Sequence, residues 1–217
     1  MSDKRSVSKK RKIISALKNR FFPGSKRYWE ERYREGRDSG VGSYGKIAEF
    51  KAEVINESVR ENEIESAIEF GCGDGNQLSL FDITNYVGLD ISEKAIELCK
   101  KRFQHDDSKR FFLYEPENFD RSFPEFKAEL ALSLDVIFHI IEDDIYELYM
   151  EHLFSGAERF VMIYSDDTDT KQRYHVKRRK FTRWIEKNAD GWKLVKRIEN
   201  RYPEISHSDF YVYGKSP

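Results

Sequence analysis

The sequence has few cysteines and no long hydrophobic run. Its 217 residues include two cysteines, Cys72 and Cys99, too few for the disulfide framework of a small secreted domain, and no CxxC pair indicates zinc. No apolar run approaches the ~18–20 residues that span a bilayer. The five residues between Lys12 and Lys18 are too few for the core of a signal peptide. We therefore expect a cytoplasmic globular protein without a transmembrane segment.

Neither sign of charge is in excess, because Lys and Arg total 38 and Asp and Glu total 39. This balance excludes a uniformly basic nucleic-acid binder, although it leaves room for local patches. Residues 1–37 hold 13 basic residues against four acidic ones, and residues 171–201 hold 12 against three. Each stretch is either a solvated face or a surface for an anionic partner. The length favours a single domain, and the aromatic share of 14% is enough to fill its core.

Residues 1–24 are predicted to form a basic amphipathic helix with a short connection. Within residues 10–22, five apolar side chains share one helical face, and Lys or Arg lies elsewhere. They are Ile13, Ile14, Leu17, Phe21 and Phe22. Pro23 then ends the helix. Residues 9–22 either make a weak peripheral contact with an anionic membrane or dock on the protein's own core or on a partner protein.

Residues 25–62 are predicted to form a helical cap. One helix begins near Ser25, and a second covers residues 47–60, where apolar residues recur with helical spacing. Four glycines between Gly36 and Gly45 predict a flexible loop between the two helices. The segment precedes the first predicted strand, so it forms a lid or cap on the domain that follows.

From residue 63 onward, strands and helices alternate. Strands are predicted at residues 66–70, 86–90, 111–114, 130–134, 160–164, 192–198 and 210–214, and helices at 92–103, 145–154 and 176–188. The first five strands are nearly all apolar, which is typical of parallel strands buried on both faces. The last two are joined by a loop too short for a helical crossover, so we expect them to pair antiparallel. Residues 63–217 are therefore predicted to form an α/β domain with a seven-stranded, mostly parallel sheet and helices on both faces.

A glycine-rich turn follows the first predicted strand, where residues 69–75 read EFGCGDG. Glycine lets the backbone turn sharply and approach a ligand closely, since no Cβ intervenes. The spacing is G-x-G-x-G, and Glu69 stands two positions before the first glycine. Fifteen residues after Gly75, Asp90 ends the second strand, where a carboxylate can accept both hydroxyls of a ribose. The pattern GxxxxGK[ST] is absent, which argues against a nucleotide triphosphatase.

These features together resemble the class I S-adenosylmethionine-dependent methyltransferases. The resemblance covers residues 65–164 in order and spacing, and the late antiparallel strand pair fits the end of the same family's sheet. It implies a Rossmann-like fold and S-adenosyl-L-methionine as cofactor. The residues that it assigns to the cofactor are Glu69, Gly71, Cys72, Gly73, Gly75, Asp90, Ile91, Asn118, Phe119 and Leu134. Among them, Asp90 would take the ribose hydroxyls, and Asn118 and Phe119 would lie against the adenine.

An aromatic segment precedes the first strand, with YWEERY at residues 28–33 and GSYG at residues 42–45. Aromatic lids in this position are common in the resembled family. We therefore expect Trp29, Arg32 and Tyr44 to contact the cofactor, with Arg32 placed to pair with its methionine carboxylate. The alternative is that Trp29 only packs the N-terminal helix on the sheet.

Two ionisable residues, Asp135 and His139, follow the fourth predicted strand. In the resembled family this strand ends near the methyl group, so both side chains would face the acceptor. A neutral imidazole can take a proton from an acceptor hydroxyl, because its pKa lies near neutral pH. Asp135 either orients His139 or acts as the base itself. His139 is otherwise a buried structural histidine.

A looser resemblance, carried by YWEERY, GSYGKIAEFK and HVKRRKFTRWI, is to glycan-modifying methyltransferases of bacterial or viral gene clusters. It implies methylation of a sugar hydroxyl of a glycan or glycoconjugate. The side chains expected to line an acceptor cleft are Tyr164, Ser165, Asp166, Asp167, His175 and Arg178.

Two other functions and a metal site remain as alternatives. An RNA methyltransferase would use the basic stretches 4–12 and 171–183, but no Asn-Pro-Pro-Tyr motif follows the fourth strand, so we expect no nucleic-acid partner. A cofactor-binding scaffold without activity is the other alternative. Asp135 with Asp166 or Asp167 would suit Mg²⁺ by residue type. Because acidic residues in loops are more often solvated, we expect no metal.

Overall fold

Residues 21–216 are described by the computed structural model. Two helices open this part of the chain, α2 (Ser25–Arg34) and α3 (Gly45–Glu61), joined by a loop that contains the 3₁₀ turn η1 (Val41–Ser43). Both helices agree with the sequence prediction. The predicted helix at residues 10–22, and with it the membrane or partner contact, falls almost wholly outside the described residues. Between residues 21 and 216, no helix is both long and apolar enough to cross a membrane.

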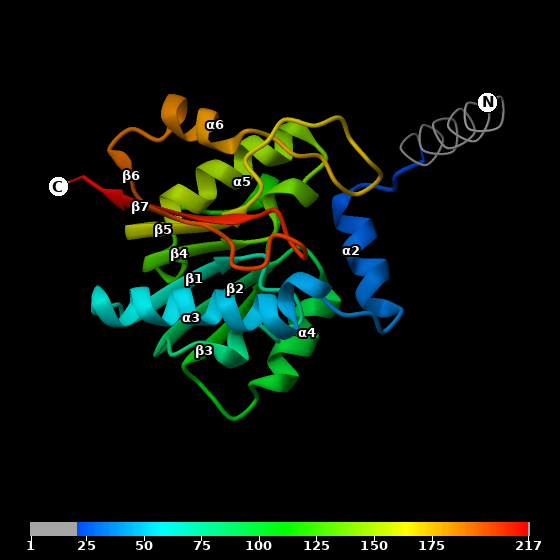
Figure 1. The fold of residues 1–217 in the computed structure, drawn as a ribbon. Helices are drawn as coiled ribbons and strands as arrows, with labels where there is room; N and C mark the ends of the chain where they lie inside the picture. The colour runs from blue at the N-terminus through cyan, green and yellow to red at the C-terminus, as the bar shows by residue number, and fades with distance from the viewer. Residues whose placement is uncertain (1–20, 217) are drawn as a thin grey trace.

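Seven strands form one sheet in the order β3-β2-β1-β4-β5-β7-β6 (Figure 1). They are β1 (Ser66–Phe70), β2 (Asn85–Asp90), β3 (Lys109–Leu113), β4 (Ala128–Leu134), β5 (Ala157–Ser165), β6 (Trp192–Ile198) and β7 (Asp209–Lys215). The strands β1 to β5 pair in parallel, whereas β7 is antiparallel to both β5 and β6. The predicted fold class is confirmed, including the antiparallel end of the sheet.

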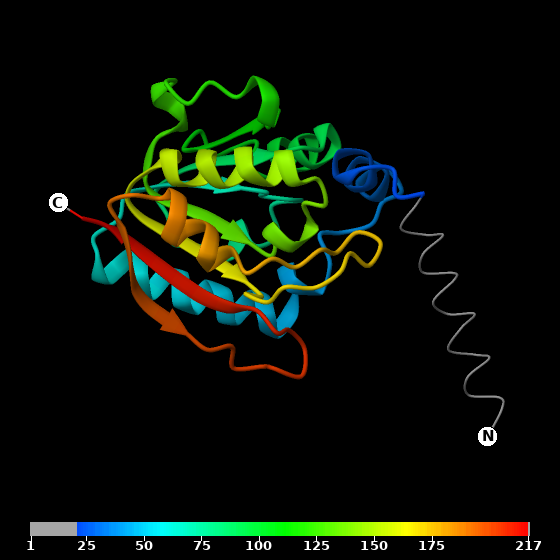
Figure 2. The same cartoon turned by 90° about the horizontal axis from the view of Figure 1, so that it is seen from above.

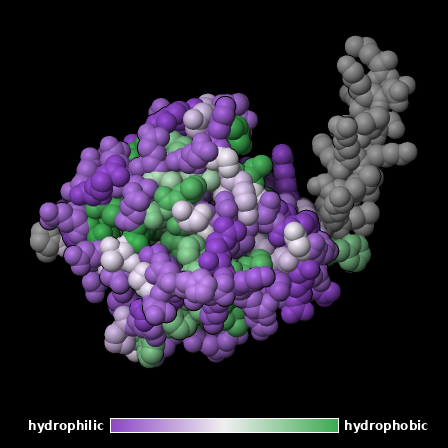
Figure 3. Space-filling model, turned by 90° about the horizontal axis from the view of Figure 1, so that it is seen from below, coloured by the Kyte–Doolittle hydropathy of each residue, from purple (hydrophilic) through white to green (hydrophobic). Residues whose placement is uncertain are grey.

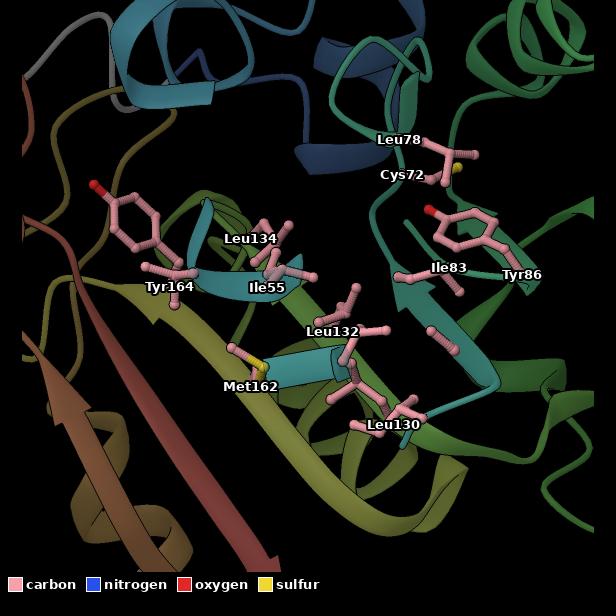
Figure 4. Packing of buried hydrophobic residues seen from close by; sticks show 14 of the residues in the cluster. Ile55, Cys72, Leu78, Ile83, Tyr86, Leu130, Leu132, Leu134, Met162 and Tyr164 are labelled. Carbon is pink, nitrogen blue, oxygen red and sulfur yellow. The ribbon is translucent and has the colours of Figure 1, made fainter. Parts of the chain in front are cut away.

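Helices cover both faces of the sheet (Figure 2). The helices α3 and α4 (Glu93–Arg102) pack on one face, and α5 (Asp143–Gly156) and α6 (Phe181–Asn188) pack on the other. Side chains alternate along β4, so Leu132 and Leu134 lie on the α3 side and Ala131 lies on the α5 side. Figure 4 shows these leucines beside Ile55 of α3. Each buried leucine contributes about 1.5–3 kcal/mol to folding.

The helix α3 belongs to the core. The cap therefore covers fewer residues than the predicted 25–62. The apolar side chains of α3, including Ile55, are fully buried against the sheet. The helix α2 lies instead at the end of the domain, next to α4. Glu30 of α2 accepts hydrogen bonds from the Ser92 hydroxyl (2.6 Å) and the Lys94 backbone N–H (3.2 Å), at the N-terminus of α4. The cap therefore consists of α2 and the loop at residues 35–44.

Two crossover connections contain short 3₁₀ turns in place of a long helix. The turn η2 (Leu78–Leu80) lies between β1 and β2, and η3 (Pro116–Asn118) and η4 (Pro124–Phe126) lie between β3 and β4. In the second connection the rings of Phe119 and Phe126 stack at 4.9 Å and pack against the core beside α5. Phe119 therefore fills space over the sheet that a helix would otherwise cover.

The helix predicted at residues 176–188 begins five residues later, because α6 covers only Phe181–Asn188. Before α6, the backbone N–H of Lys177 donates to the Phe138 carbonyl at 2.8 Å. The side chains of Lys177 and Arg179 both bind the Asp143 carboxylate at 2.7 Å. These contacts hold the segment in an extended path against the start of α5, so helical spacing alone placed the boundary wrongly.

Six of the twelve basic residues of the stretch 171–201 form ion pairs with carboxylates. The ion pairs are Lys177–Asp143, Arg178–Asp166, Arg179–Asp143, Arg183–Asp169, Arg197–Asp209 and Arg201–Glu53. The fold thus neutralises part of the local excess of positive charge. The face drawn in Figure 3 is mostly hydrophilic, with hydrophobic side chains in smaller patches.

Candidate active site

A cavity of about 1030 Å³ opens at the carboxyl ends of the parallel strands. Its wall comes from residues at or just after the ends of β1, β2, β4 and β5, from α2 and α3, from the turn η5 (Ile137–His139), and from the loops at residues 39–43, 175–178 and 205–208. Ligand pockets in proteins span about 300–1,000 Å³. The cavity therefore has room for a cofactor together with an acceptor.

The glycine turn after β1 forms part of this wall and excludes side chains. Gly71 has a φ of +93°, and a Cβ there would lie 2.4 Å from Val136 Cγ2. Gly73 has a φ of +58°, and a Cβ there would lie 2.4 Å from Ser39 Oγ. Both positions require glycine for conformation and for space. They leave the backbone itself as the surface that a ligand meets.

A second feature suited to a ligand is the side chain of Gln77, which is buried and lines the cavity. Its Nε2 donates to the Ala48 carbonyl at 3.0 Å. Its Oε1 is buried without a hydrogen-bond partner among the described residues. Buried acceptors are normally paired, so this oxygen favours a ligand that brings a donor.

Asp90 ends β2 as predicted, and its carboxylate is held by two backbone donors. Gly73 N–H donates to Oδ2 and Ser92 N–H donates to Oδ1, both at 2.9 Å. Burial raises the pKa of Asp90 to about 6, and the two hydrogen bonds oppose that rise. The group is therefore ionised at neutral pH. Each oxygen keeps a lone pair that can accept a ligand hydroxyl.

Glu69 is also buried at the cavity wall, beside Tyr86. The Tyr86 hydroxyl donates to Glu69 Oε2 at 2.5 Å. Burial raises the pKa of Glu69 to about 7, while this hydrogen bond and the nearby Lys51 charge lower it. Near neutral pH the side chain therefore changes between its neutral and charged forms.

Tyr44 lies outside the cavity lining and holds the cap loop to the glycine turn. Its hydroxyl donates to Asp74 Oδ2 at 2.9 Å, and Ser39 N–H donates to the same oxygen at 3.0 Å. The Asp74 N–H in turn donates to Ser39 Oγ at 3.0 Å. Tyr44 therefore acts through Asp74, which the sequence prediction did not include. The expected direct contact between Tyr44 and a cofactor is not supported by this position.

Three more residues predicted to contact the cofactor lie away from the cavity wall. A Cβ at Gly75 would lie 3.0 Å from Cys99 Sγ, so this glycine lets α4 pack closely. Phe119 is part of the aromatic cluster beside α5, and Asn118 is exposed at the end of η3. Pro116 and Glu117 line the cavity in their place. Asn118 and Phe119 lie outside the cavity lining because Pro116 begins a turn there and Phe119 packs into the core.

The cap residues Trp29 and Arg32 do line the cavity, together with Cys72, Ile91 and Leu134. The Trp29 ring is nearly perpendicular to the His139 ring, with centroids 5.0 Å apart. Arg32 donates from Nε to the Asp38 carbonyl at 2.7 Å, and its guanidinium lies 5.7 Å from the Trp29 ring centre. The cap thus closes the cavity from the side opposite the strand ends.

His139 lies at the cavity wall with one ring nitrogen already engaged. Its Nδ1 is 3.0 Å from the backbone carbonyl of His175, and the two imidazoles stack at 5.2 Å. A carbonyl can only accept, so Nδ1 carries the proton and Nε2 keeps its lone pair. Burial lowers the pKa of His139 to about 4. At neutral pH the ring is therefore neutral, and its Nε2 can accept a proton.

Asp135 pairs with a lysine that the sequence prediction missed. Lys51 Nζ donates to Asp135 Oδ2 at 2.9 Å, and the Lys51 side chain is 0% exposed. Asp135 itself has a φ of +60°, a conformation that costs a non-glycine residue about 1–3 kcal/mol. A signal for Lys51 was present, because it stands four residues from both Ile47 and Ile55 and so shares the buried face of α3.

The residues expected to form an acceptor cleft divide into two groups. Asp166, His175 and Arg178 line the cavity, and Arg178 Nε lies 2.8 Å from Asp166 Oδ2. Tyr164, Ser165 and Asp167 do not line it. Asp167 instead accepts a hydrogen bond from the Thr182 N–H at the start of α6 (3.0 Å).

Of the acidic residues considered for Mg²⁺, Asp135 and Asp166 line the cavity, and each is paired with a cationic side chain. Asp135 pairs with Lys51, and Asp166 pairs with Arg178. Residues 21–216 contain no group of three or more His, Cys, Asp or Glu side chains arranged to hold a metal ion.

The sequence and the fold were compared with those of known proteins. Residues 68–153 match the model of a methyltransferase domain. None of the curated proteins compared with the chain matches it. The fold is similar to that of three solved methyltransferases. Their sequence identities to this chain are low, so they show likeness of fold alone.

The first is magnesium protoporphyrin IX methyltransferase from Synechocystis with bound S-adenosylhomocysteine. Its sequence is 16% identical to this chain, and the TM-score is 0.64. The match covers 88% of this chain and 100% of that one. The second, 1,6-didemethyltoxoflavin-N1-methyltransferase from Burkholderia thailandensis, is 16% identical, with a TM-score of 0.67 and coverage of 88% and 87%. The third, an amino pentose methyltransferase from Micromonospora echinaspora with bound S-adenosylmethionine, is 11% identical, with a TM-score of 0.62 and coverage of 87% and 97%. Residues 68–153 are therefore a methyltransferase domain, for which S-adenosylmethionine is the cofactor, and the whole chain has the fold of the S-adenosylmethionine-dependent methyltransferases.

Proposed function

We propose that this enzyme transfers a methyl group to a sugar hydroxyl of a glycan or glycoconjugate, with His139 as the base. The observation that carries the proposal is the Nδ1 contact of His139 with the His175 carbonyl, which leaves Nε2 as a proton acceptor at the cavity wall. A sugar hydroxyl has a pKa far above neutral, so its methylation benefits from such a base.

The chain's own residues divide the cavity into a cofactor end and an acceptor end. At the cofactor end, Asp90 holds the ribose hydroxyls, Ile91 lies against the adenine, and the backbone at residues 71–73 meets the methionine portion. Arg32 pairs with the methionine carboxylate, as a guanidinium readily does. The bound cofactor supplies an electrophilic methyl group. The remaining cofactor contacts that we propose come from Trp29, Glu69, Cys72 and Leu134.

His139 is a better base than Asp135 in this arrangement. As the acceptor oxygen forms its new bond to carbon, the hydroxyl proton passes to His139 Nε2. The imidazole is neutral at pH 7 and has one free lone pair. Asp135 Oδ2 already accepts a hydrogen bond from the Lys51 ammonium at 2.9 Å, and Oδ1 accepts one from the Ser208 hydroxyl at 3.4 Å, so both of its oxygens are engaged.

The acceptor end has the polar character that a polyhydroxylated acceptor needs. Two ion pairs, Lys51–Asp135 and Arg178–Asp166, offer donors and acceptors side by side along its wall. His139 and the hydroxyl of Ser208 lie in the same wall. Sugar hydroxyls donate and accept hydrogen bonds at once, so mixed walls of this kind suit them.

The ion pairs formed by residues 171–183 weigh against RNA as the acceptor. Four of the basic residues at 171–183 are paired with carboxylates, namely Lys177, Arg178, Arg179 and Arg183. Binding to phosphates depends on basic side chains that can exchange mobile counterions for the nucleic acid. The other basic stretch, residues 4–12, lies outside the described residues.

A methyl-transfer screen tests the proposal. S-Adenosylmethionine labelled in its methyl group is incubated with the enzyme and separate panels of saccharides, glycolipids and RNA. We expect label in at least one saccharide or glycolipid, and a loss of ~10²-fold or more in kcat for His139→Gln. His105→Gln, at an exposed position on the chain between α4 and β3, is the matched control and should retain wild-type kcat. Label that enters RNA alone would contradict the proposal.

A further inference from the structure

Lys51 carries a positive charge inside the protein, at the acceptor end of the cavity. Its side chain is 0% exposed, and the Tyr164 ring centre lies 5.4 Å from its Nζ. An ammonium group has three N–H donors. Asp135 Oδ2 accepts one of them at 2.9 Å, and Lys51 also lines the cavity. The ammonium is therefore enclosed in the wall, and the Asp135 carboxylate is the part of the pair that a ligand can reach.

The carboxylate of Asp135 is fixed in place from several sides. The backbone of Gly42 lies so close that a Cβ there would be 2.5 Å from Asp135 Oδ2. The Ser208 hydroxyl donates to Asp135 Oδ1 at 3.4 Å, and the Asp135 N–H donates to the Tyr164 carbonyl at 2.9 Å. The side chain keeps 18% exposure and lines the cavity. Its unused lone pairs are therefore held at one position.

Fold stability alone gives no reason for this pair. Two buried charges lose their hydration, and apolar side chains of similar volume often stabilise a core equally well. Asp135 is moreover held in the left-handed region at φ +60°, a conformation that tends to occur at functional sites. The arrangement is instead suited to binding, because a buried ammonium holds a carboxylate acceptor at the cavity wall.

A sugar hydroxyl presents the complementary group, since it can donate a hydrogen bond to the carboxylate that Lys51 holds in place. We propose that the Lys51–Asp135 pair binds the hydroxyl adjacent to the one that is methylated, so that the acceptor is a vicinal diol. This inference rests on the proposed function. It adds that Lys51 and Asp135 determine which sugar hydroxyls the enzyme accepts. An acceptor without the second hydroxyl leaves the Asp135 carboxylate without that hydrogen bond in the wall and is rejected.

The pair can be observed directly in the wild-type enzyme. A buried ammonium exchanges its protons slowly with water, so the ¹⁵Nζ signal of Lys51 is accessible to NMR. The probes are methyl glycosides of gluco, galacto and manno configuration, each beside its 2-, 3- and 4-deoxy analogues, added to enzyme saturated with S-adenosylhomocysteine. We expect at least one glycoside to shift the Lys51 signal. We expect its analogue lacking one of the paired hydroxyls to bind at least tenfold more weakly.

Two variants check that the discrimination comes from this pair. Lys51→Met together with Asp135→Asn removes both charges, and it should bind the glycoside and its deoxy analogue with equal affinity. Lys109→Met removes a lysine that donates to the Ile83 carbonyl at 2.9 Å, remote from the cavity, and it should keep the tenfold difference.

Three outcomes would overturn the inference: a panel in which no glycoside shifts the Lys51 signal, equal binding of parent and deoxy glycosides to the wild type, or discrimination that survives in the double variant. Methyl transfer to the same glycosides is measured separately. Glycosides that shift the Lys51 signal and are never methylated would contradict the proposed function and leave the binding role of the pair standing.

Discussion

The Nδ1 atom of His139 lies 3.0 Å from the backbone carbonyl oxygen of His175, so a residue 36 positions away sets the tautomer of the imidazole. Because the partner is a backbone carbonyl, replacement of the His175 side chain leaves the acceptor atom in place. The loop that carries His175 is itself held by Lys177, whose N–H donates to the Phe138 carbonyl at 2.8 Å. The contact therefore depends on the path of the loop before α6.

The pH dependence of kcat tests His139 as the base. Burial lowers the pKa of His139 from the ordinary histidine value of 6.5 to about 4. The ring therefore stays neutral well below pH 6.5. At saturating cofactor and acceptor, we expect the histidine-dependent limb of kcat to fall only as the pH drops through about 4. A fall in kcat with its midpoint near pH 6.5 would contradict the buried His139 as the base. In His139→Gln the limb should disappear along with ~10²-fold of kcat.

The affinity for S-adenosylmethionine should weaken in mild acid through Asp90. Burial raises the pKa of Asp90 to about 6, so the carboxylate that would hold the ribose is charged above pH 6 and protonated below it. Between pH 7.5 and pH 5 we expect the dissociation constant to rise about tenfold. Calorimetric titration across this range measures it.

Glu69 titrates in the same region, with a pKa of about 7, and therefore needs a separate variant. In Glu69→Gln the step near pH 6 should remain, whereas in Asp90→Asn it should vanish. An unchanged step in Asp90→Asn would show that another group controls cofactor binding.

Single replacements in the Lys51–Asp135 pair should destabilise the fold more than the double replacement does. Asp135→Asn leaves the fully buried Lys51 ammonium without its partner, which costs about 3–5 kcal/mol, and Lys51→Met leaves the partly exposed Asp135 carboxylate without its partner at a smaller cost. Lys51→Met with Asp135→Asn leaves no unpaired charge, so its loss of stability should be smaller than that of either single variant. Denaturant unfolding of the wild type, the two single variants and the double variant measures the four free energies of unfolding. Additive losses would mean that the two side chains do not stabilise each other.

The cap should contribute to cofactor affinity through Trp29. Its ring lies 5.0 Å from His139 and 5.9 Å from Tyr33, and it lines the cavity. We expect Trp29→Ala to raise the dissociation constant for S-adenosylmethionine several-fold, because the open cap admits water. Trp192→Ala is the matched control, since Trp192 packs on Phe154 away from the cavity, and its cofactor affinity should equal that of the wild type. Equal affinities for all three proteins would leave Trp29 with a packing role only.

The membrane contact predicted for residues 9–22 is tested by truncation. Removal of residues 1–22 should leave a folded enzyme that binds the cofactor, because among the described residues the cavity wall begins at Pro23. If the segment is a membrane contact, full-length protein sediments with anionic vesicles at low salt and the truncated protein does not. Full-length protein that stays in the supernatant would contradict a membrane contact.

The sheet and the cofactor end could be predicted because both depend on local signals. Apolar runs mark buried strands wherever they occur, and glycine at residues 71 and 73 is required by backbone conformation. Asp90 was found by its place at a strand end. These features need only the neighbouring residues to be interpreted.

The acceptor end was harder to predict because its partners come from distant segments. Lys51 and Asp135 are 84 residues apart, and nothing near Asp135 in the sequence announces a lysine. Tyr44 was assigned to the cofactor by its aromatic ring, whereas its hydroxyl binds Asp74. The start of α6 was misplaced for the same reason, since the contacts of Lys177 with Asp143 are tertiary.

The most direct test of the central claim is the chemical identity of the methylated product. Acceptors that gain label are prepared on a larger scale with ¹³C-methyl S-adenosylmethionine, and the new methyl carbon and its neighbours are assigned by NMR. The account predicts a methyl ether on a sugar carbon that has a free hydroxyl on the adjacent carbon, formed by the wild type and at least ~10²-fold more slowly by His139→Gln. A methyl group on nitrogen, on a carboxylate or on RNA would contradict it.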